Sequence, residues 1–90
     1  MLKIEYTNKF KKDYKRILAR HLNESLLDDV LSLLIEEKPL PAKYRDHDLV
    51  GEYIGCRECH IQPDWLLIYR KDKEFLTLIL TRTGSHSDLF

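Results

Sequence analysis

The chain has 90 residues, which is the size of one small domain and leaves no room for a second. Hydrophobic residues make up 43% of it and charged residues 33%, enough for a single core with a hydrated surface. The 15 basic and 15 acidic residues cancel, so overall charge gives no argument for nucleic-acid binding.

The sequence shows neither a signal peptide nor a membrane-spanning segment. No apolar stretch of about 7–15 residues follows the first charged residues, as a signal peptide would require. No run approaches the roughly 18 apolar residues of a transmembrane helix. We therefore expect a cytoplasmic protein with no membrane partner and with its two cysteines reduced.

The first part of the chain predicts a short strand and two amphipathic helices. Residues 2–6 alternate between apolar and charged side chains, which is typical of a strand. Thr7 and Asn23 are suitable N-caps, and apolar residues recur at three- and four-residue spacing after each of them. The second helix should end at Lys38, because the residue before a proline avoids the α region.

The two predicted helices carry opposite charge. Residues 1–21 hold seven basic and two acidic side chains, whereas residues 22–37 hold five acidic and no basic ones. Two complementary, solvated faces explain this pattern. The alternative is that the basic helix also attracts a phosphate backbone.

The second half of the chain predicts an antiparallel sheet after a loop over residues 38–50. Alternating residues over 52–61 meet a break at 62–64, and a dense apolar run over 65–70 follows, which is the pattern of a β-hairpin. Residues 75–81 predict one more buried strand. The fold class is therefore α+β in the order β-α-α-β-β-β, a two-helix hairpin packed on an antiparallel sheet in one domain over residues 1–90.

The stretch Cys56 to His60 matches the C-x-x-C-H pattern of haem attachment. On a strand, residues three apart point to opposite faces and their Cα atoms lie roughly 10 Å apart. A disulfide needs Cα atoms within about 7 Å, so a redox pair is excluded, and a zinc site fails for the same reason. We expect Cys59 to pack with Tyr53 and Ile61, and we expect no metal and no cofactor.

Five polar side chains stand in loops or at strand ends near the predicted bend: His47, His60, Asp64, Arg82 and His86. Strand parity directs His60 away from the helices, to the open face of the sheet. Histidines with an arginine suit phosphodiester cleavage without a metal, because one imidazole takes a proton, another donates one, and the guanidinium binds the charged oxygens. RNA supplies its own nucleophile, the 2′-hydroxyl. Trp65 and Phe90 can offer faces for stacking bases, with core packing as the alternative for Trp65.

Three blocks of the sequence resemble the RelE superfamily, most closely the YafQ-type mRNA interferase toxins of bacterial type II toxin–antitoxin systems. The blocks are LPAKYRDHDL (40–49), HIQPDWLLIY (60–69), and RTGSH (82–86) with the terminal LF (89–90). The resemblance covers essentially the whole chain. It implies a RelE-like fold and a ribosome-dependent endoribonuclease that cleaves mRNA in the A site.

The resemblance also assigns roles to residues. The family's acid/base and substrate-orienting positions correspond to His47, His60, Asp64 and His86. Arg82 falls at the phosphate-stabilising position, Trp65 beside the active site, and Phe90 at a C-terminal aromatic needed for activity. With Asp64 able to orient an imidazole, His60 or His47 is expected to be the base and His86 the acid.

The implied partners are a cognate antitoxin that neutralises the toxin, the ribosome with its mRNA, and operator DNA only through the antitoxin. The family is commonly basic whereas this chain is neutral, so docking to the ribosome has to depend on local patches such as the first helix. The alternative function is a RelE-fold binding module that docks a partner protein or the ribosome without cleaving. The complete set of histidines and Arg82 argues against that alternative.

Overall fold

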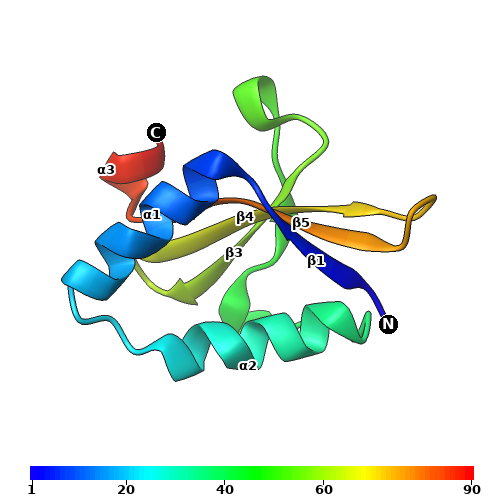
Figure 1. Cartoon of the computed structure of the whole chain (residues 1–90), viewed down its shortest axis with the longest axis horizontal. Helices are drawn as coiled ribbons and strands as arrows, with labels where there is room; N and C mark the ends of the chain where they lie inside the picture. The colour runs from blue at the N-terminus through cyan, green and yellow to red at the C-terminus, as the bar shows by residue number, and fades with distance from the viewer.

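The computed structural model describes all 90 residues as three α-helices and a five-stranded sheet in the order β1-β5-β4-β3-β2 (Figure 1). Two 3₁₀ turns, η1 and η2, lie in the connection that precedes β3. The elements are β1 (Lys3–Tyr6), α1 (Asn8–Ala19), α2 (Glu24–Ile35), η1 (Ala42–Tyr44), β2 (His47–Asp48), η2 (Gly51–Tyr53), β3 (Arg57–Gln62), β4 (Trp65–Asp72), β5 (Thr77–Gly84) and α3 (His86–Leu89).

The sheet is mixed, which corrects the expectation of a wholly antiparallel sheet. Strands β2 to β5 pair antiparallel, but β1 lies parallel to β5 at the other edge. The physical reason is the path of the chain: the α1–α2 hairpin separates β1 from the other strands, so no tight turn forces it to run opposite to its neighbour. The remaining α+β architecture agrees with the prediction.

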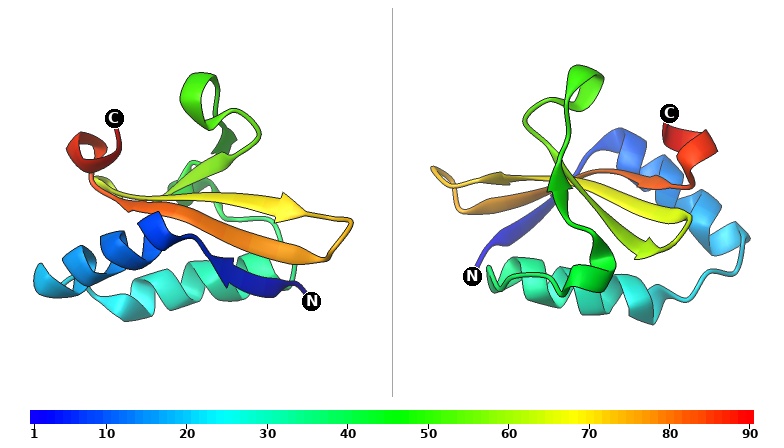
Figure 2. Two further views of the ribbon diagram at one scale, coloured as in Figure 1. Left: turned by 45° about the horizontal axis from the view of Figure 1, so that its top comes forward. Right: turned by 180° about the vertical axis from the view of Figure 1, so that it is seen from behind.

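Helices α1 and α2 cover one face of the sheet, and the other face stays open over part of its area (Figure 2). Thr7 and Asn23 cap the two helices as predicted, since the side-chain oxygen of each accepts a backbone N–H at 3.0 Å. Apolar residues of both helices, such as Ile17 and Val30, pack with the inner face of the sheet, where Leu67 is also fully buried. The core therefore lies between the helical hairpin and the sheet.

Strand β3 carries the alternation on which the site depends. Cys59 and Ile61 belong to the core beneath the helices, while Glu58 and His60 point to the open face, as parity predicted. Tyr53 is a correction: it lies in η2 and packs on the open face against the cluster of Leu66, Ile68 and Leu89. Residues 51–56 are not strand, because glycines with positive φ at 51 and 55 turn the chain there.

The loop expected over residues 38–50 contains the short edge strand β2. His47 pairs with Glu58 and Asp48 with Arg57. Arg57 reinforces this pairing, since its guanidinium binds Asp46 at 3.0 Å and Asp48 at 2.6 Å. A two-residue strand carries no readable periodicity, yet this one brings His47 beside β3.

The two cysteines are free thiols in different surroundings. Cys59 has no exposed surface, and burial raises its pKa to about 12, whereas Cys56 is half-buried. No helix of this chain has both the length and the apolar character to cross a membrane.

Candidate active site

Three imidazoles form a row on the open face. They come from different elements: His47 from β2, His60 from β3 and His86 from the start of α3. Ring centroids of His47 and His60 are 6.2 Å apart, and those of His60 and His86 are 5.6 Å apart. Segments that are up to 39 positions apart in the chain thus supply one continuous row of titratable groups.

A carboxylate that the sequence analysis missed lies between two of these rings. Glu58 is only 5% exposed, and its Oε1 lies 3.5 Å from His47 Nε2 and 3.4 Å from His60 Nε2. The available signal was its position two residues before His60, which puts both side chains on the same face of β3. Glu58 can therefore stabilise a proton on either imidazole.

The backbone selects which ring nitrogen of these two histidines exchanges protons. Nδ1 of His47 lies 2.6 Å from the carbonyl oxygen of Arg45, and Nδ1 of His60 lies 3.4 Å from that of Pro63. A carbonyl oxygen can only accept, so Nδ1 carries a hydrogen in each ring. Nε2 is left as the atom that gains and loses a proton.

Asp64 orients His86. Its Oδ1 lies 2.7 Å from His86 Nδ1 and also accepts the backbone N–H of His86 at 2.9 Å. These two hydrogen bonds, the backbone one first, hold the pKa of Asp64 below its usual value. The carboxylate fixes the ring with Nδ1–H toward itself and leaves Nε2 free.

The turn that carries His86 is fastened to the end of α1. Ser85 and Asp88 form a reciprocal capping box, with hydrogen bonds of 2.9 and 3.2 Å. Arg20 donates two further hydrogen bonds to Asp88 at 2.6 and 3.0 Å, and these contacts hold the pKa of Asp88 below its ordinary value. A Cβ at Gly84 would lie 2.8 Å from the Asp88 carboxylate, so this close approach requires glycine.

Arg82 is held by a second residue that the sequence analysis missed. Asp13 of α1 is 2% exposed, and its carboxylate accepts hydrogen bonds from Arg82 Nε at 2.7 Å and Nη2 at 3.0 Å. This contact raises the pKa of Arg82. Nη1 donates one hydrogen to Tyr53 Oη at 3.4 Å, so one hydrogen on Nη1 and one on Nη2 remain available. Asp13 could have been noticed because it follows Phe10 by three positions and thus shares the apolar face of its helix.

The two aromatic residues proposed to stack on bases differ in exposure. Trp65 is 2% exposed, and its indole N–H donates to Thr83 Oγ1 at 2.9 Å. No face of the ring is left for a base, so Trp65 has the core role and the expected stacking is wrong. Phe90 is 66% exposed and meets Tyr53 edge to face, with ring centroids 5.8 Å apart. A face of Phe90 is therefore open.

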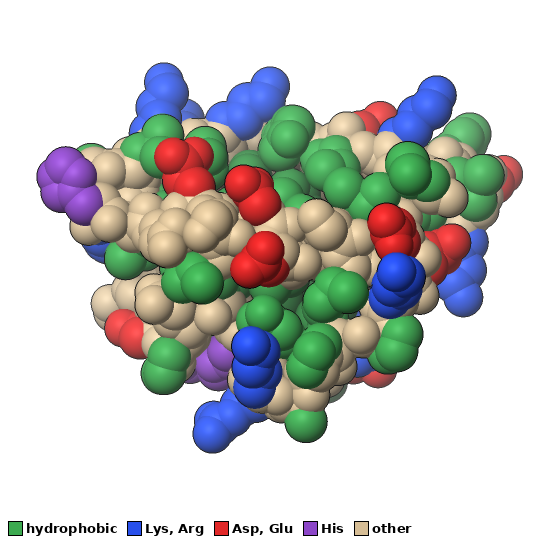
Figure 3. Space-filling view, turned by 90° about the horizontal axis from the view of Figure 1, so that it is seen from below, with side chains coloured by type: hydrophobic (Ala, Val, Ile, Leu, Met, Phe, Trp, Pro, Cys, Tyr) green, Lys and Arg blue, Asp and Glu red, His purple; other side chains and the backbone are tan.

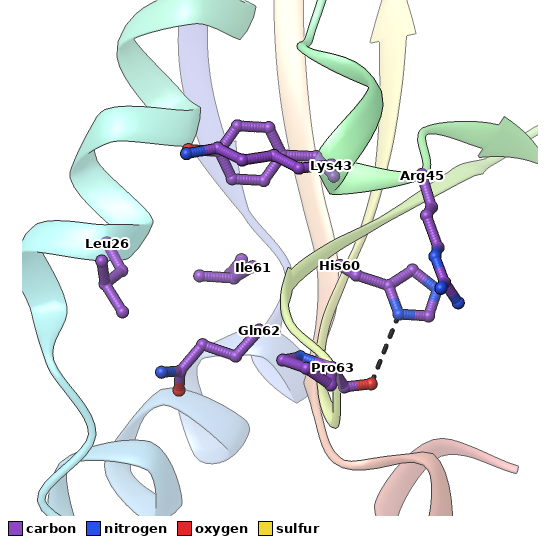
Figure 4. Close-up of a pocket in the computed structure, with 8 residues that line it drawn as sticks. Leu26, Lys43, Arg45, His60, Ile61, Gln62 and Pro63 are labelled. Atoms are coloured by element: carbon purple, nitrogen blue, oxygen red, sulfur yellow. Dashed lines mark hydrogen bonds between the residues drawn. The ribbon is translucent and has the colours of Figure 1, made fainter.

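A hollow of about 430 Å³ opens beside His60, between α2, η1 and the β3–β4 turn (Figure 4). Lys43 and Arg45 line it from the η1 segment on different sides: Lys43 lies on the side of α2, whereas Arg45 extends toward the His60 ring. Gln62 projects into the hollow from the end of β3. The hollow thus adjoins the middle histidine of the row and has basic side chains at its rim.

The family model for the YafQ toxin, a bacterial toxin of type II toxin–antitoxin systems, matches residues 2–90. A curated relative, the mRNA interferase toxin YafQ of Escherichia coli strain K12, is 42% identical over 88 residues, which are 97% of this chain and 94% of the relative. The family model and the curated relative therefore both match this chain over nearly its full length.

Solved structures agree as well. A metal-bound toxin from Helicobacter pylori is 47% identical with a TM-score of 0.94, and the match covers 100% of both chains. YafQ in the E. coli DinJ–YafQ complex is 41% identical with a TM-score of 0.90, over 100% of this chain and 99% of that one. In the present chain no group of three or more His, Cys, Asp or Glu side chains is arranged to hold a metal ion. By sequence and by fold, this chain belongs to the YafQ family of bacterial type II toxin–antitoxin toxins.

Proposed function

We propose that the chain is an endoribonuclease toxin that cleaves mRNA in the ribosomal A site by metal-independent acid/base catalysis. The observation that carries the proposal is the row of three imidazoles on the open face, each with one ring nitrogen fixed by a neighbour. Arg82 contacts Tyr53, which packs on the same face. Membership in a family whose curated relatives are named mRNA interferases supports the same reaction.

The reaction uses the 2′-hydroxyl of the RNA as nucleophile. His60, or His47 beside it, accepts the hydroxyl proton at Nε2, and Glu58 stabilises the imidazolium that forms. The 2′-oxygen attacks the phosphorus and the bond to the 5′-oxygen breaks. His86, held at Nδ1 by Asp64, donates a proton from Nε2 to that leaving oxygen. The products are a 2′,3′-cyclic phosphate and a free 5′-hydroxyl, and each proton transfer contributes about 10²–10⁴-fold.

Arg82 and Phe90 bind the substrate around this step. The Nη1 side of Arg82 donates hydrogen bonds to the non-bridging oxygens as negative charge builds on them, while Asp13 holds the guanidinium in place. The exposed face of Phe90 stacks on a base. Removal of one donor of this kind costs about 10²–10³ in kcat.

A 2′-deoxy substitution tests the chemistry directly. One mRNA carries deoxyribose only at the nucleotide before the cut, and its all-ribose twin is the control. Protein treated with a chelator, which is dialysed away before ribosomes are added, should cut the control and leave a 2′,3′-cyclic phosphate. Cleavage of the deoxy mRNA, or a loss of activity on chelation that added metal restores, would overturn the proposed mechanism.

Docking to the ribosome is supported by the outer face of α1. Lys9, Lys11, Lys12 and Lys15 are exposed, and none of them makes an ion pair. Free lysines on one face attract RNA phosphates in a way that depends on salt. This local patch supplies the positive potential that the neutral chain lacks as a whole.

A cognate antitoxin is the proposed protein partner, and a groove between α1 and α2 is its proposed seat. Tyr6, Phe10 and Tyr14 line up along the groove, with ring centroids 5.6 and 6.1 Å apart. Lys11 stands on the α1 side and Asp28 on the α2 side. Figure 3 shows the same arrangement on this face, with hydrophobic side chains between basic and acidic ones. An amphipathic antitoxin segment with charges of both signs is complementary to it, and operator DNA would be contacted only through the antitoxin.

The alternative function is a RelE-fold module that docks the ribosome or a partner without cleaving. The free lysines of α1 and the apolar groove would suffice for docking alone. Translation on programmed ribosomes separates the two functions: arrest with uncut mRNA would favour the binding module, and arrest with cut mRNA would favour the nuclease.

A further inference from the structure

The roles proposed for the histidines, Arg82 and Phe90 leave the nucleotide before the scissile phosphate without a binding site. The row runs His47, His60, His86, so the acid His86 stands at one end and the two candidate bases occupy the middle and the other end. The attacking 2′-hydroxyl belongs to the nucleotide before the cut, so that nucleotide must lie beside the base. His60 is one of the side chains that line the hollow of about 430 Å³.

The charges at the hollow suit an anion. Lys43 and Arg45 make no ion pair, whereas Arg57, Arg82 and Arg20 are all paired with carboxylates. Lys43 is steadied over the ring of the neighbouring tyrosine, with its Nζ 5.0 Å from the ring centroid. Two free cations at the rim of a depression next to a phosphodiester-cleaving centre favour an RNA phosphate as ligand.

The interior of the hollow suits a base. Leu26 and Ile61 supply an apolar wall, and Pro63 closes the turn side. The Gln62 amide projects into this space and offers both a donor and an acceptor, which is what hydrogen bonding to the edge of a base requires. A volume of about 430 Å³ lies within the range of small-ligand sites.

We propose that this hollow is the subsite for the mRNA nucleotide that carries the attacking 2′-hydroxyl, with Gln62 reading the edge of its base and Lys43 and Arg45 each binding one of the phosphates that flank it. The inference rests on the proposed endoribonuclease function and deepens it. Its consequence is that sequence preference at the nucleotide before the cut depends on Gln62. Affinity for any nucleotide there depends on the two cations.

The first test measures binding without the ribosome and without cleavage. Three-nucleotide RNAs with a 2′-deoxy centre, one for each of the four bases, are titrated into the isolated protein and followed by NMR. We expect shifts of the backbone amides of Gln62 and Ile61, and dissociation constants that differ by about fivefold or more among the bases, as edge-specific hydrogen bonds allow. Shifts confined to other parts of the chain would overturn the proposal.

Matched variants separate the two parts of the subsite. Gln62→Leu keeps the approximate shape of the side chain and removes both of its hydrogen-bonding groups. The dissociation constants of the four RNAs should then differ by less than about twofold. Lys43→Ala and Arg45→Asn should weaken the binding of all four RNAs alike. Each should reduce the slope of log affinity against log salt concentration by about 0.7 in magnitude, which is the value for loss of one single-strand phosphate contact. Asn is chosen at 45 because this residue has φ +49°, which Asn tolerates. Lys73→Ala, at the exposed β4–β5 turn, is the control and should change nothing.

A cleavage experiment distinguishes a failure of the subsite from a failure of the proposed endoribonuclease function. Wild type and Gln62→Leu are compared on programmed ribosomes with mRNAs that differ only at the nucleotide before the cut. A change of the preferred base with cutting retained supports the subsite, and an unchanged preference overturns it. If wild type cuts none of these mRNAs, the endoribonuclease function fails, and the NMR titration still decides whether the hollow binds a nucleotide.

Discussion

Replacing Asp13 with asparagine should destabilise the fold strongly although it changes only one functional group. Asn keeps the shape of the side chain but removes the charge and turns one acceptor into a donor. The Arg82 guanidinium, whose side chain is 17% exposed, would then lie against an amide instead of a carboxylate. The backbone N–H of Thr83, which donates to Asp13 at 3.2 Å, would lose part of its acceptor as well.

The magnitude follows from the environment of the pair. Breaking a buried ion pair by removing one partner costs about 3–5 kcal/mol, because it leaves an uncompensated charge. Arg82 keeps some contact with water and with Tyr53, so we expect the lower end, about 3 kcal/mol. At about 5 °C per kcal/mol for a domain of this size, the Tm should fall by roughly 15 °C.

Urea unfolding at pH 7, followed by circular dichroism, measures this loss. Asp29→Asn, at an exposed position of α2 without an ion pair, is the matched control and should change the free energy of unfolding by less than about 0.5 kcal/mol. In a double-mutant cycle, Asp13→Asn with Arg82→Gln should cost about 2 kcal/mol less than the sum of the single changes. A loss below about 1 kcal/mol for Asp13→Asn, or additive effects in the cycle, would refute the assigned role.

Three further predictions follow from the surroundings of single groups. Asp88 has a lowered pKa, so the stability that its ion pair supplies is present above about pH 4 and is lost as pH falls below it; Asp88→Asn should reduce the acid-induced drop in urea midpoint. The hydrogen bond to Glu24, followed by burial, raises the pKa of Tyr14 to about 12. Its contribution is therefore present below about pH 10 and is lost toward pH 12, and the difference in urea midpoint between wild type and Tyr14→Phe should shrink over that range. A thiol reagent should label Cys56 in the native protein and Cys59 only after unfolding, and two labels without denaturant would contradict the burial of Cys59.

Local signals in the sequence were sufficient to predict the helices and the central hairpin. Thr7 and Asn23 cap the helices because a side-chain oxygen in front of an apolar repeat satisfies a free N–H wherever it occurs. The parity of β3 correctly directed His60 to the open face, since alternation depends only on backbone geometry. The strand with which β1 pairs, and the direction of that pairing, could not be predicted from local signals, because the pairing of β1 with β5 joins residues more than 70 positions apart.

The same limit explains what was missed in the site. Glu58 and Asp13 are acidic residues in contexts where acids are normally solvated, and only the tertiary arrangement buries each beside a cation or an imidazole. Trp65 was misjudged for the opposite reason, because a tryptophan after a turn suits a binding face as well as a core. Which histidine Asp64 orients was open until the start of α3 was located beside the β3–β4 turn.

Primer extension on ribosomes programmed with a defined mRNA tests the proposed chemistry most directly. Wild type and the His60→Ala/His86→Ala double variant are compared after chelator treatment and dialysis, with circular dichroism to confirm that both are folded. We predict discrete cuts in the A-site codon by wild type and none by the double variant. Equal cutting by the folded double variant would contradict the role given to the histidine row, and arrest by wild type without any cut would contradict the nuclease itself.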